Sequence, residues 1–206
     1  MPYIGQIPSA KLLTASDITD GVISTAKLAD SSVTSAKITD GTIASGDLAS
    51  GVGGKILQVQ SAFKSDTAST ASTSDVAITG LSLTLTPSAT SSKVLVMFAV
   101  GTSGGNASSH FFFTPYRDIG GGGYNAIGLG VGGGLYNYAS SDQPYASNNN
   151  YGAMANNFLD SPNTTSEITY KLYFRTNAGH TSYINRRVAD DNFRGASSLT
   201  CIEIGA

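Results

Sequence analysis

The first quarter of the chain carries a large apolar residue at every fifth position, with small or polar residues between. Five residues advance an α-helix by about 500°, so these side chains would not share one helical face. On a flat strand they would alternate between the two faces. The spacing therefore predicts one turn in each pentad, and "TDG", "ADS" and "ASG" supply turn-forming residues. The eight large residues are Leu13, Ile18, Ile23, Leu28, Val33, Ile38, Ile43 and Leu48.

Two structures would bury these residues. One is a single-chain, four-sided β-coil, because the small–x–large–x–x pattern resembles the pentapeptide-repeat family. The other is a shaft of three intertwined chains, with the eight large residues in a common axial core. Eight pentads give only two four-sided coils, fewer than stacked repeats need. We therefore predict a trimeric shaft over residues 13–54, with the coil and a flexible low-complexity linker as the alternatives.

Composition changes at "SGVGGK", residues 50–55, and short alternating or compact apolar runs follow. No segment shows a convincing helical period. We therefore predict that residues 55–206 form an antiparallel β-sandwich similar to a jelly roll, and that the chain is all-β. Phe111 and Phe113 are expected to share one face of a strand and Phe112 to take the other, with one of these faces in the subunit core and one in a trimer interface. The predicted strands cover residues 55–63, 76–87, 92–100, 109–118, 124–131, 166–176, 181–187 and 198–205.

Charge and cysteine content narrow the function. The 206 residues carry a formal net charge of −2 and only 13% are charged, which argues against nucleic-acid binding. Cys201 is the only cysteine, so no internal disulfide can form. No apolar run reaches the roughly 18 residues of a membrane span, and we expect no membrane insertion. "PYIGQIPSAK" does not resemble a signal peptide, so folding in a cytoplasm is expected.

Catalytic motifs are weak. "GLGVGG" at 128–133 matches a dinucleotide-binding fingerprint, but no helix is predicted after it. His110 and His180 lie far apart and, with Cys201, give no metal-ligand spacing. Glycan-cleaving enzymes use paired carboxylates, and Asp190, Asp191 and Glu167 are the acids considered for this role. Asp190 and Asp191 are adjacent, so on a strand they would point to opposite faces and make a poor pair. We therefore expect no enzyme, catalytic residue, metal or cofactor.

One polar loop is a candidate for receptor binding. "YNYASSDQPYASNNNY" at 136–151 combines tyrosines with Ser and Asn, as antibody loops do. Such side chains suit stacking on sugar rings and hydrogen bonding to hydroxyls. The alternatives are an ordinary polar loop or tyrosines in a subunit interface. The candidate residues are Tyr136, Tyr138, Tyr145, Asn148, Asn149, Asn150 and Tyr151.

"MPYIGQIPSA", "ITDGTIASGDLASG", "GKILQVQSAF" and the terminal "LTCIEIGA" resemble virion fibre proteins of tailed bacteriophages. The resemblance implies a homotrimer with a virion-docking peptide at residues 1–12, a shaft, and a C-terminal knob that binds a host glycan or protein. The resemblance leaves the role in the virion open between a tail fibre, a head fibre and a small spike subunit. A purely structural decoration or connector is the alternative function. The implied location is the virion, assembled in the host cytoplasm. Docking onto a tail adaptor, nozzle or other virion protein is assigned to Pro2, Tyr3, Ile4 and Ile7.

Overall fold

The chain divides into two compact units, Met1–Gly53 and Gly54–Ala206. The computed structural model describes residues 14–48 of the first unit. In the second unit it describes residues 55–104, 110–130, 151–176, 180–188, 190 and 192–205.

The first unit turns once every five residues. The 3-10 turns η1 Ala15–Asp17, η2 Thr25–Lys27, η3 Ser35–Lys37 and η4 Ser45–Asp47 recur every ten residues. A four-residue turn lies midway between each pair. In all seven turns a carbonyl accepts a hydrogen bond, 2.9–3.1 Å long, from the amide three residues later, and this confirms the predicted turn in each pentad. The accepting residues are Thr14, Thr19, Ser24, Ala29, Thr34, Thr39 and Ala44.

The intermediate turns need a left-handed residue at their third position. Gly21 and Gly41 have φ of +78°, and Ser31 takes the equivalent position with φ of +61°. Glycine adopts this conformation without steric penalty, whereas serine does not. Across residues 14–48 no described side chain is buried and no residue lies in a strand. This part of the single chain therefore does not form the self-contained β-coil.

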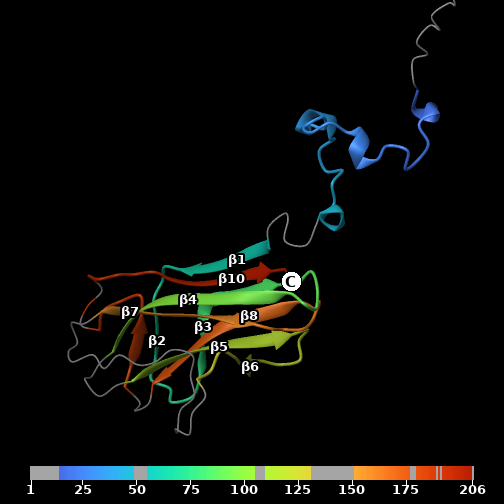
Figure 1. Cartoon of the computed structure of the whole chain (residues 1–206). Helices are drawn as coiled ribbons and strands as arrows, with labels where there is room; N and C mark the ends of the chain where they lie inside the picture. The colour runs from blue at the N-terminus through green and yellow to red at the C-terminus, as the bar shows by residue number, and fades with distance from the viewer. Residues whose placement is uncertain are drawn as a thin grey trace, which may run out of the picture. The chain divides into compact units, whose positions relative to one another are not determined.

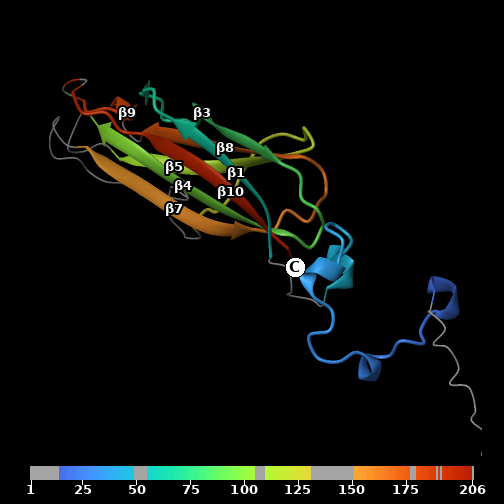
Figure 2. The same cartoon turned by 90° about the horizontal axis from the view of Figure 1, so that it is seen from above.

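The second unit is a sandwich of two antiparallel sheets lying face to face (Figures 1 and 2), as predicted. In sheet A, the order is β1-β10-β4-β9-β2, and β7 pairs with the other side of β4. Sheet B has the order β3-β8-β5-β6. Sheet A contains β1 Ile56–Lys64, β2 Ala68–Thr70, β4 Lys93–Gly104, β7 Gly152–Asp160, β9 Ser182–Ile184 and β10 Ser197–Ile204; sheet B contains β3 Val76–Leu85, β5 Phe111–Ile119, β6 Asn125–Ala126 and β8 Ile168–Thr176.

The core lies between the sheets and follows the alternation in the sequence. Along β8 every second residue is buried, and Ile168, Tyr170 and Leu172 are fully enclosed. The continuous apolar run in 92–100 forms the central strand β4, which pairs with both β10 and β7. Strands that are half buried on one face show a period of two, and this explains why the pattern located most of them correctly.

Three segments differ from the sequence-based prediction. β2 and β7 were not predicted, and residues 124–131 yield only the two-residue strand β6. The β7 sequence contains Gly152, Asn156 and Asn157, which have low strand propensity. Its pairing with β4 in continuous register outweighs that propensity.

The triple-phenylalanine segment of β5 alternates as expected. Phe111 and Phe113 belong to the core between the sheets. Phe112 points to the other face, but it is only 2% exposed, and the Arg175 guanidinium lies 4.8 Å from the centre of its ring. Phe112 is thus covered within its own chain and offers little surface to a trimer partner.

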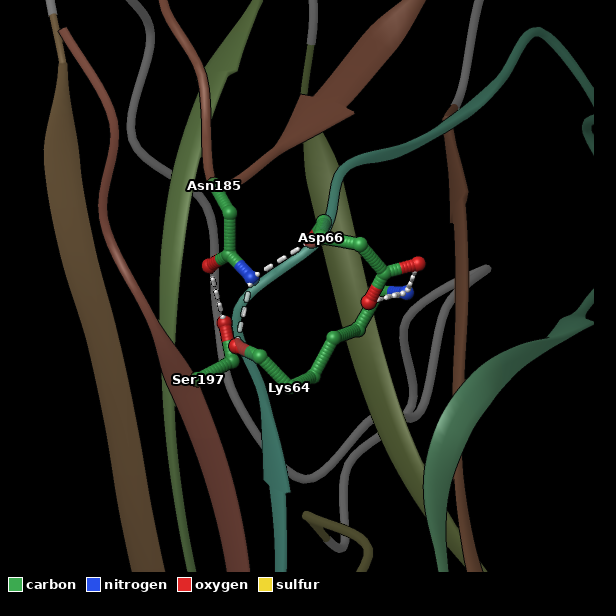
Figure 3. A network of polar contacts seen from close by, with 4 residues as sticks. All are labelled: Lys64, Asp66, Asn185 and Ser197. Carbon is green, nitrogen blue, oxygen red and sulfur yellow. Dashed lines mark hydrogen bonds and ion pairs between the residues drawn. The ribbon is translucent and has the colours of Figure 1, made fainter.

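Asn185 closes a break in sheet A. β1 and β2 follow each other along the sheet edge, and β10 and β9 pair with them in turn. At this junction the Asn185 side-chain amide donates hydrogen bonds to the carbonyls of Lys64 (2.8 Å) and Asp66 (2.9 Å). Its carbonyl oxygen accepts one from the Ser197 hydroxyl at 2.6 Å (Figure 3). Asn185 is fully buried, so these bonds replace ladder bonds that the interrupted strands lack.

Candidate functional site

The repeat presents a regular row of uncovered apolar side chains. Leu13 lies outside the described residues, and the other seven predicted shaft residues are all exposed. Their exposed fractions run from 36% at Leu48 to 54% at Val33. The turns recur with the same five-residue interval along the sequence, and the described part of the single chain leaves these residues accessible to a partner.

Charged side chains of the repeat close its turns. Asp17 and Asp47 accept hydrogen bonds from the amides of Thr14 and Ala44, each at 2.9 Å. The Lys27 ammonium donates to the Val22 carbonyl at 3.0 Å, and Lys37 repeats this arrangement ten residues later. These contacts assign Asp17, Lys27, Lys37 and Asp47 to local structure.

The other predicted site residues lie mainly outside the described part of the chain. These are the docking residues Pro2, Tyr3, Ile4 and Ile7, and Tyr136, Tyr138, Tyr145, Asn148, Asn149 and Asn150 of the receptor loop.

Tyr151 is described, and it is anchored in the sandwich. A Cβ atom added at Gly101 or at Gly195 would lie 1.8 Å from its hydroxyl oxygen, so the ring end occupies a slot between two glycines. Burial raises the pKa of the Tyr151 hydroxyl. The hydroxyl is therefore directed into the fold.

A cluster of tyrosines lies on the outer face of sheet B. The rings of Tyr116 and Tyr173 are 4.2 Å apart, and those of Tyr124 and Tyr173 are 6.3 Å apart. The Lys171 ammonium lies 4.4 Å from the centre of the Tyr124 ring. All four side chains are partly exposed. We call Tyr116, Tyr124, Lys171 and Tyr173 the tyrosine face.

Asp75 and Arg175 support one end of this face. The Tyr116 hydroxyl donates a 2.6 Å hydrogen bond to Asp75, whose other oxygen lies 3.4 Å from Arg175 Nε. Burial, and then the Asp75 carboxylate, raise the pKa of Tyr116 to about 12. Tyr116 is therefore a neutral hydrogen-bond donor, and the face offers aromatic surface, hydroxyls and one ammonium group to a ligand.

The sequence contained only part of the signal for this face. Lys171, Tyr173 and Arg175 alternate along one strand, which places them on the same side of the sheet. The register that sets Phe112 opposite Arg175 and Tyr116 opposite Lys171 comes from the pairing of β5 with β8. These two strands are far apart in the sequence, so their register was not predicted.

The most buried carboxylates have structural partners. Asp160 of sheet A accepts hydrogen bonds from Arg117 (2.6 Å) and Tyr170 (2.8 Å) of sheet B, and so joins the two layers. Glu203 accepts from the Gln58 amide and from the Ser88 backbone amide, both at 2.6 Å. Burial favours the neutral acid, but these hydrogen bonds hold the pKa of Glu203 below its ordinary value.

The structure describes only part of the residues considered for catalysis. Asp190 is paired with Arg187, and Asp191 lies outside the described residues. Gly128 faces the Phe158 ring, which a Cβ atom would approach to 2.6 Å, so it serves close packing. Among the described residues, no group of three or more His, Cys, Asp or Glu side chains could hold a metal ion. Nor does any helix within the described ranges have the length and apolar character needed to cross a membrane.

Comparison of the sequence with protein families and with curated proteins gives no match. Among solved structures, the chain is similar to a chain in the structure of infectious bursal disease virus Gt strain, with 12% sequence identity and a TM-score of 0.39. It is also similar to the VP2 subviral particle of infectious bursal disease virus, with 14% identity and a TM-score of 0.38. Each match covers 72% of this chain but only 38% of the other. A likeness this distant does not indicate a function.

Proposed function

We propose that this protein is a structural fibre of a bacteriophage virion. It assembles as a homotrimer through its repeat, docks to the particle by its N-terminus and uses the β-sandwich knob for reversible host-surface binding. The observation that carries the proposal is the exposed row of large apolar residues at a constant spacing of five. Other copies of the chain carry the same spacing, so they can cover this row in register. The bacteriophage assignment rests on the sequence resemblance.

Native mass tests the association. We expect a species of three times the 21.1 kDa chain mass, measured by light scattering over a dilution series. Replacing Ile23 and Ile38 by Asp would place charges in the common core of the trimer. The trimer should then dissociate at a protein concentration at least tenfold higher.

Thr19→Asp with Thr39→Asp provides the matched control. It adds the same charge at two exposed positions outside the row of large apolar residues, so dissociation should change little. A monomeric mass for the unmodified protein at micromolar concentration would contradict the proposal.

For the knob, we assign host binding to the tyrosine face. Partly exposed tyrosine rings provide rigid surface for stacking, and the neighbouring hydroxyl and ammonium groups can bond to sugar hydroxyls or acidic groups. Binding by these groups involves no bond cleavage, so we propose recognition without turnover.

A glycan array with the full-length protein tests this assignment. The double variant Tyr124→Ala with Tyr173→Ala should lose binding to every glycan on the array that the unmodified protein binds. Tyr183→Ala is the control, because this tyrosine also lies under a cation, Arg186 at 4.9 Å, but belongs to sheet A. Retained binding in the double variant would move the receptor site elsewhere.

A purely structural decoration or connector is the second candidate. It is favoured by the internal bonding of the tyrosine face, in which Tyr116 is engaged by Asp75, and Tyr124 by Lys171. If neither glycans nor host cells bind the full-length trimer, this second function becomes the better one.

A further inference from the structure

We propose that the outer face of sheet A is the surface through which the knobs of neighbouring copies pack together. This inference rests on the proposed homotrimer, and it assigns the subunit interface of the knob to one face of one sheet.

The face consists of three rows of side chains that run across four strands in continuous register. Val59 is 55% exposed at one end of the first row, and Leu159 is 55% exposed at the other. Phe63, which begins the third row, is 70% exposed. The rows are Val59–Ile202–Leu95–Leu159, Ser61–Thr200–Met97–Asn157 and Phe63–Ser198–Ala99–Ala155.

This composition is unusual for a sheet face in water. The solvent-facing residues of an antiparallel sheet are normally polar, and large exposed apolar patches mark interaction sites. None of the residues in the three rows is charged, and the first row is entirely aliphatic. Depletion of charge is characteristic of the centre of protein interfaces.

The two outer faces of the sandwich differ in this respect. The outer side of sheet B carries Lys171 and Arg175, and Asp75 lies beside them. Such a face suits contact with water or a polar ligand. The outer face of sheet A suits an apolar partner.

A second copy is the partner that the chain itself supplies. The three rows of two copies would meet without repulsion between like charges, since Lys93, the charge in the next row on this side, donates a 3.0 Å hydrogen bond to Ser161 at the margin. Ile56, the first residue of β1, follows Leu48 of the repeat by only eight positions, so the link spans at most about 30 Å. Copies joined at the repeat therefore keep their knobs within reach of one another. β1 contributes Val59 and Phe63 to the face and lies at the end of the pairing order.

Thiol labelling of the full-length protein tests the inference. Cys201 is fully buried, and burial with the nearby Asp160 charge raises its pKa to about 12, so it should stay unlabelled in the native state. Ser61→Cys places a thiol in the middle row, and Thr84→Cys places one on the exposed side of sheet B. We expect a maleimide to label the Ser61→Cys trimer at least tenfold more slowly than the Thr84→Cys trimer.

The outcomes separate this inference from the proposed function. Equal labelling rates in a protein of trimeric mass would overturn the interface but leave the fibre proposal intact. A monomeric mass would overturn both. Slow labelling of Ser61→Cys in a monomer would show that another segment of the same chain covers the face, which also overturns the inference.

A charge substitution gives an independent measurement. Val59→Glu should raise the dissociation concentration of the trimer at least tenfold. Gln60→Glu, at the next residue of β1 and on the opposite face, should leave it nearly unchanged because that side chain is exposed and points away from the three rows. Equal effects of the two variants would contradict the assignment of the face.

Discussion

At the scale of single residues, Asn185 joins structural segments that no strand ladder connects. Its amide group donates two hydrogen bonds to carbonyls while its carbonyl accepts one from a hydroxyl. Asn185→Asp keeps the shape but turns an oxygen toward the carbonyls of Lys64 and Asp66. We expect a loss of about 3–5 kcal/mol in the free energy of unfolding at pH 7, because the substitution buries a charge that has no compensating partner. Urea denaturation followed by fluorescence measures this loss.

Asn163→Asp is the matched control for that variant. Asn163 has φ of +53°, in the same left-handed region as Asn185 with φ of +58°, but its side chain is exposed. A change of less than about 0.5 kcal/mol is expected there. If both substitutions have the same effect, the left-handed backbone and not the buried network would account for the loss.

Glu203 makes the stability of the sandwich depend on pH. Its folded-state pKa lies below the ordinary value of 4.5, so folding favours the ionised form. The resulting stability is fully present above that ordinary value and is lost as pH falls through the folded-state pKa. Glu203→Gln should be less stable at pH 7, and its deficit should shrink as the pH falls below the ordinary value of 4.5 and through the folded-state pKa.

Urea midpoints between pH 2 and pH 7 test this prediction. Glu167→Gln, at an exposed position before β8, should follow the unmodified protein at every pH. A deficit for Glu203→Gln that stays constant across the range would assign the effect to packing instead of charge.

Residue-level roles were the least predictable feature of the sequence. Asn185 lies in "YINRR", which predicts a strand, and nothing local shows that its amide spans a gap between strands. The role depends on Lys64 and Asp66, which are about 120 positions away along the chain. In contrast, Phe111 and Phe113 were correctly predicted to share one face, because alternation alone determines which residues point to the same side.

At the scale of elements, the repeat contains one irregular turn. Ser31 takes the left-handed position that glycine holds in the turns on either side. Ser31→Gly should therefore stabilise its turn by about 0.5–1 kcal/mol, which would slow hydrogen exchange of the Ser32 amide roughly two- to fivefold. Exchange measured by mass spectrometry or NMR provides the test.

Two substitutions define the limits of this effect. Gly41→Ser should speed exchange of the Thr42 amide, because it introduces the strain that Ser31→Gly removes. Gly46→Ser should change little, since Gly46 is outside the left-handed region and has open space where a Cβ would lie. A similar response at positions 41 and 46 would contradict the conformational argument.

Strands and turns were predictable where a local period defines them. The pentad predicted a turn every five residues, and period two located β3 and β8. β7 was missed because its asparagines weaken the local signal, and pairing with the central strand determines its conformation. The shaft core and the receptor loop stay predictions, the first because it needs other copies and the second because residues 136–150 lie outside the described ranges.

At the scale of the whole molecule, the proposed trimer converts a weak site into a strong one. Three tyrosine faces on one particle make the second and third contacts effectively intramolecular, which can raise apparent affinity by about 10²- to 10⁴-fold. A variant whose repeat no longer associates, such as Ile23→Asp with Ile38→Asp, should lose this factor on host cells. Its affinity for a soluble monovalent glycan should stay unchanged. Loss of both affinities would instead point to a damaged knob.

The two chain ends of the sandwich meet. Gly205 donates a 2.6 Å hydrogen bond to the carbonyl of Lys55, so the entry and the exit of the β-rich unit lie side by side. A unit with adjacent ends can be spliced into another protein at a single surface point, or its order can be permuted through a short linker, without stretching the fold. In the proposed fibre, such a head is an exchangeable unit, since recombination near one junction would replace the proposed recognition surface while conserving the stem.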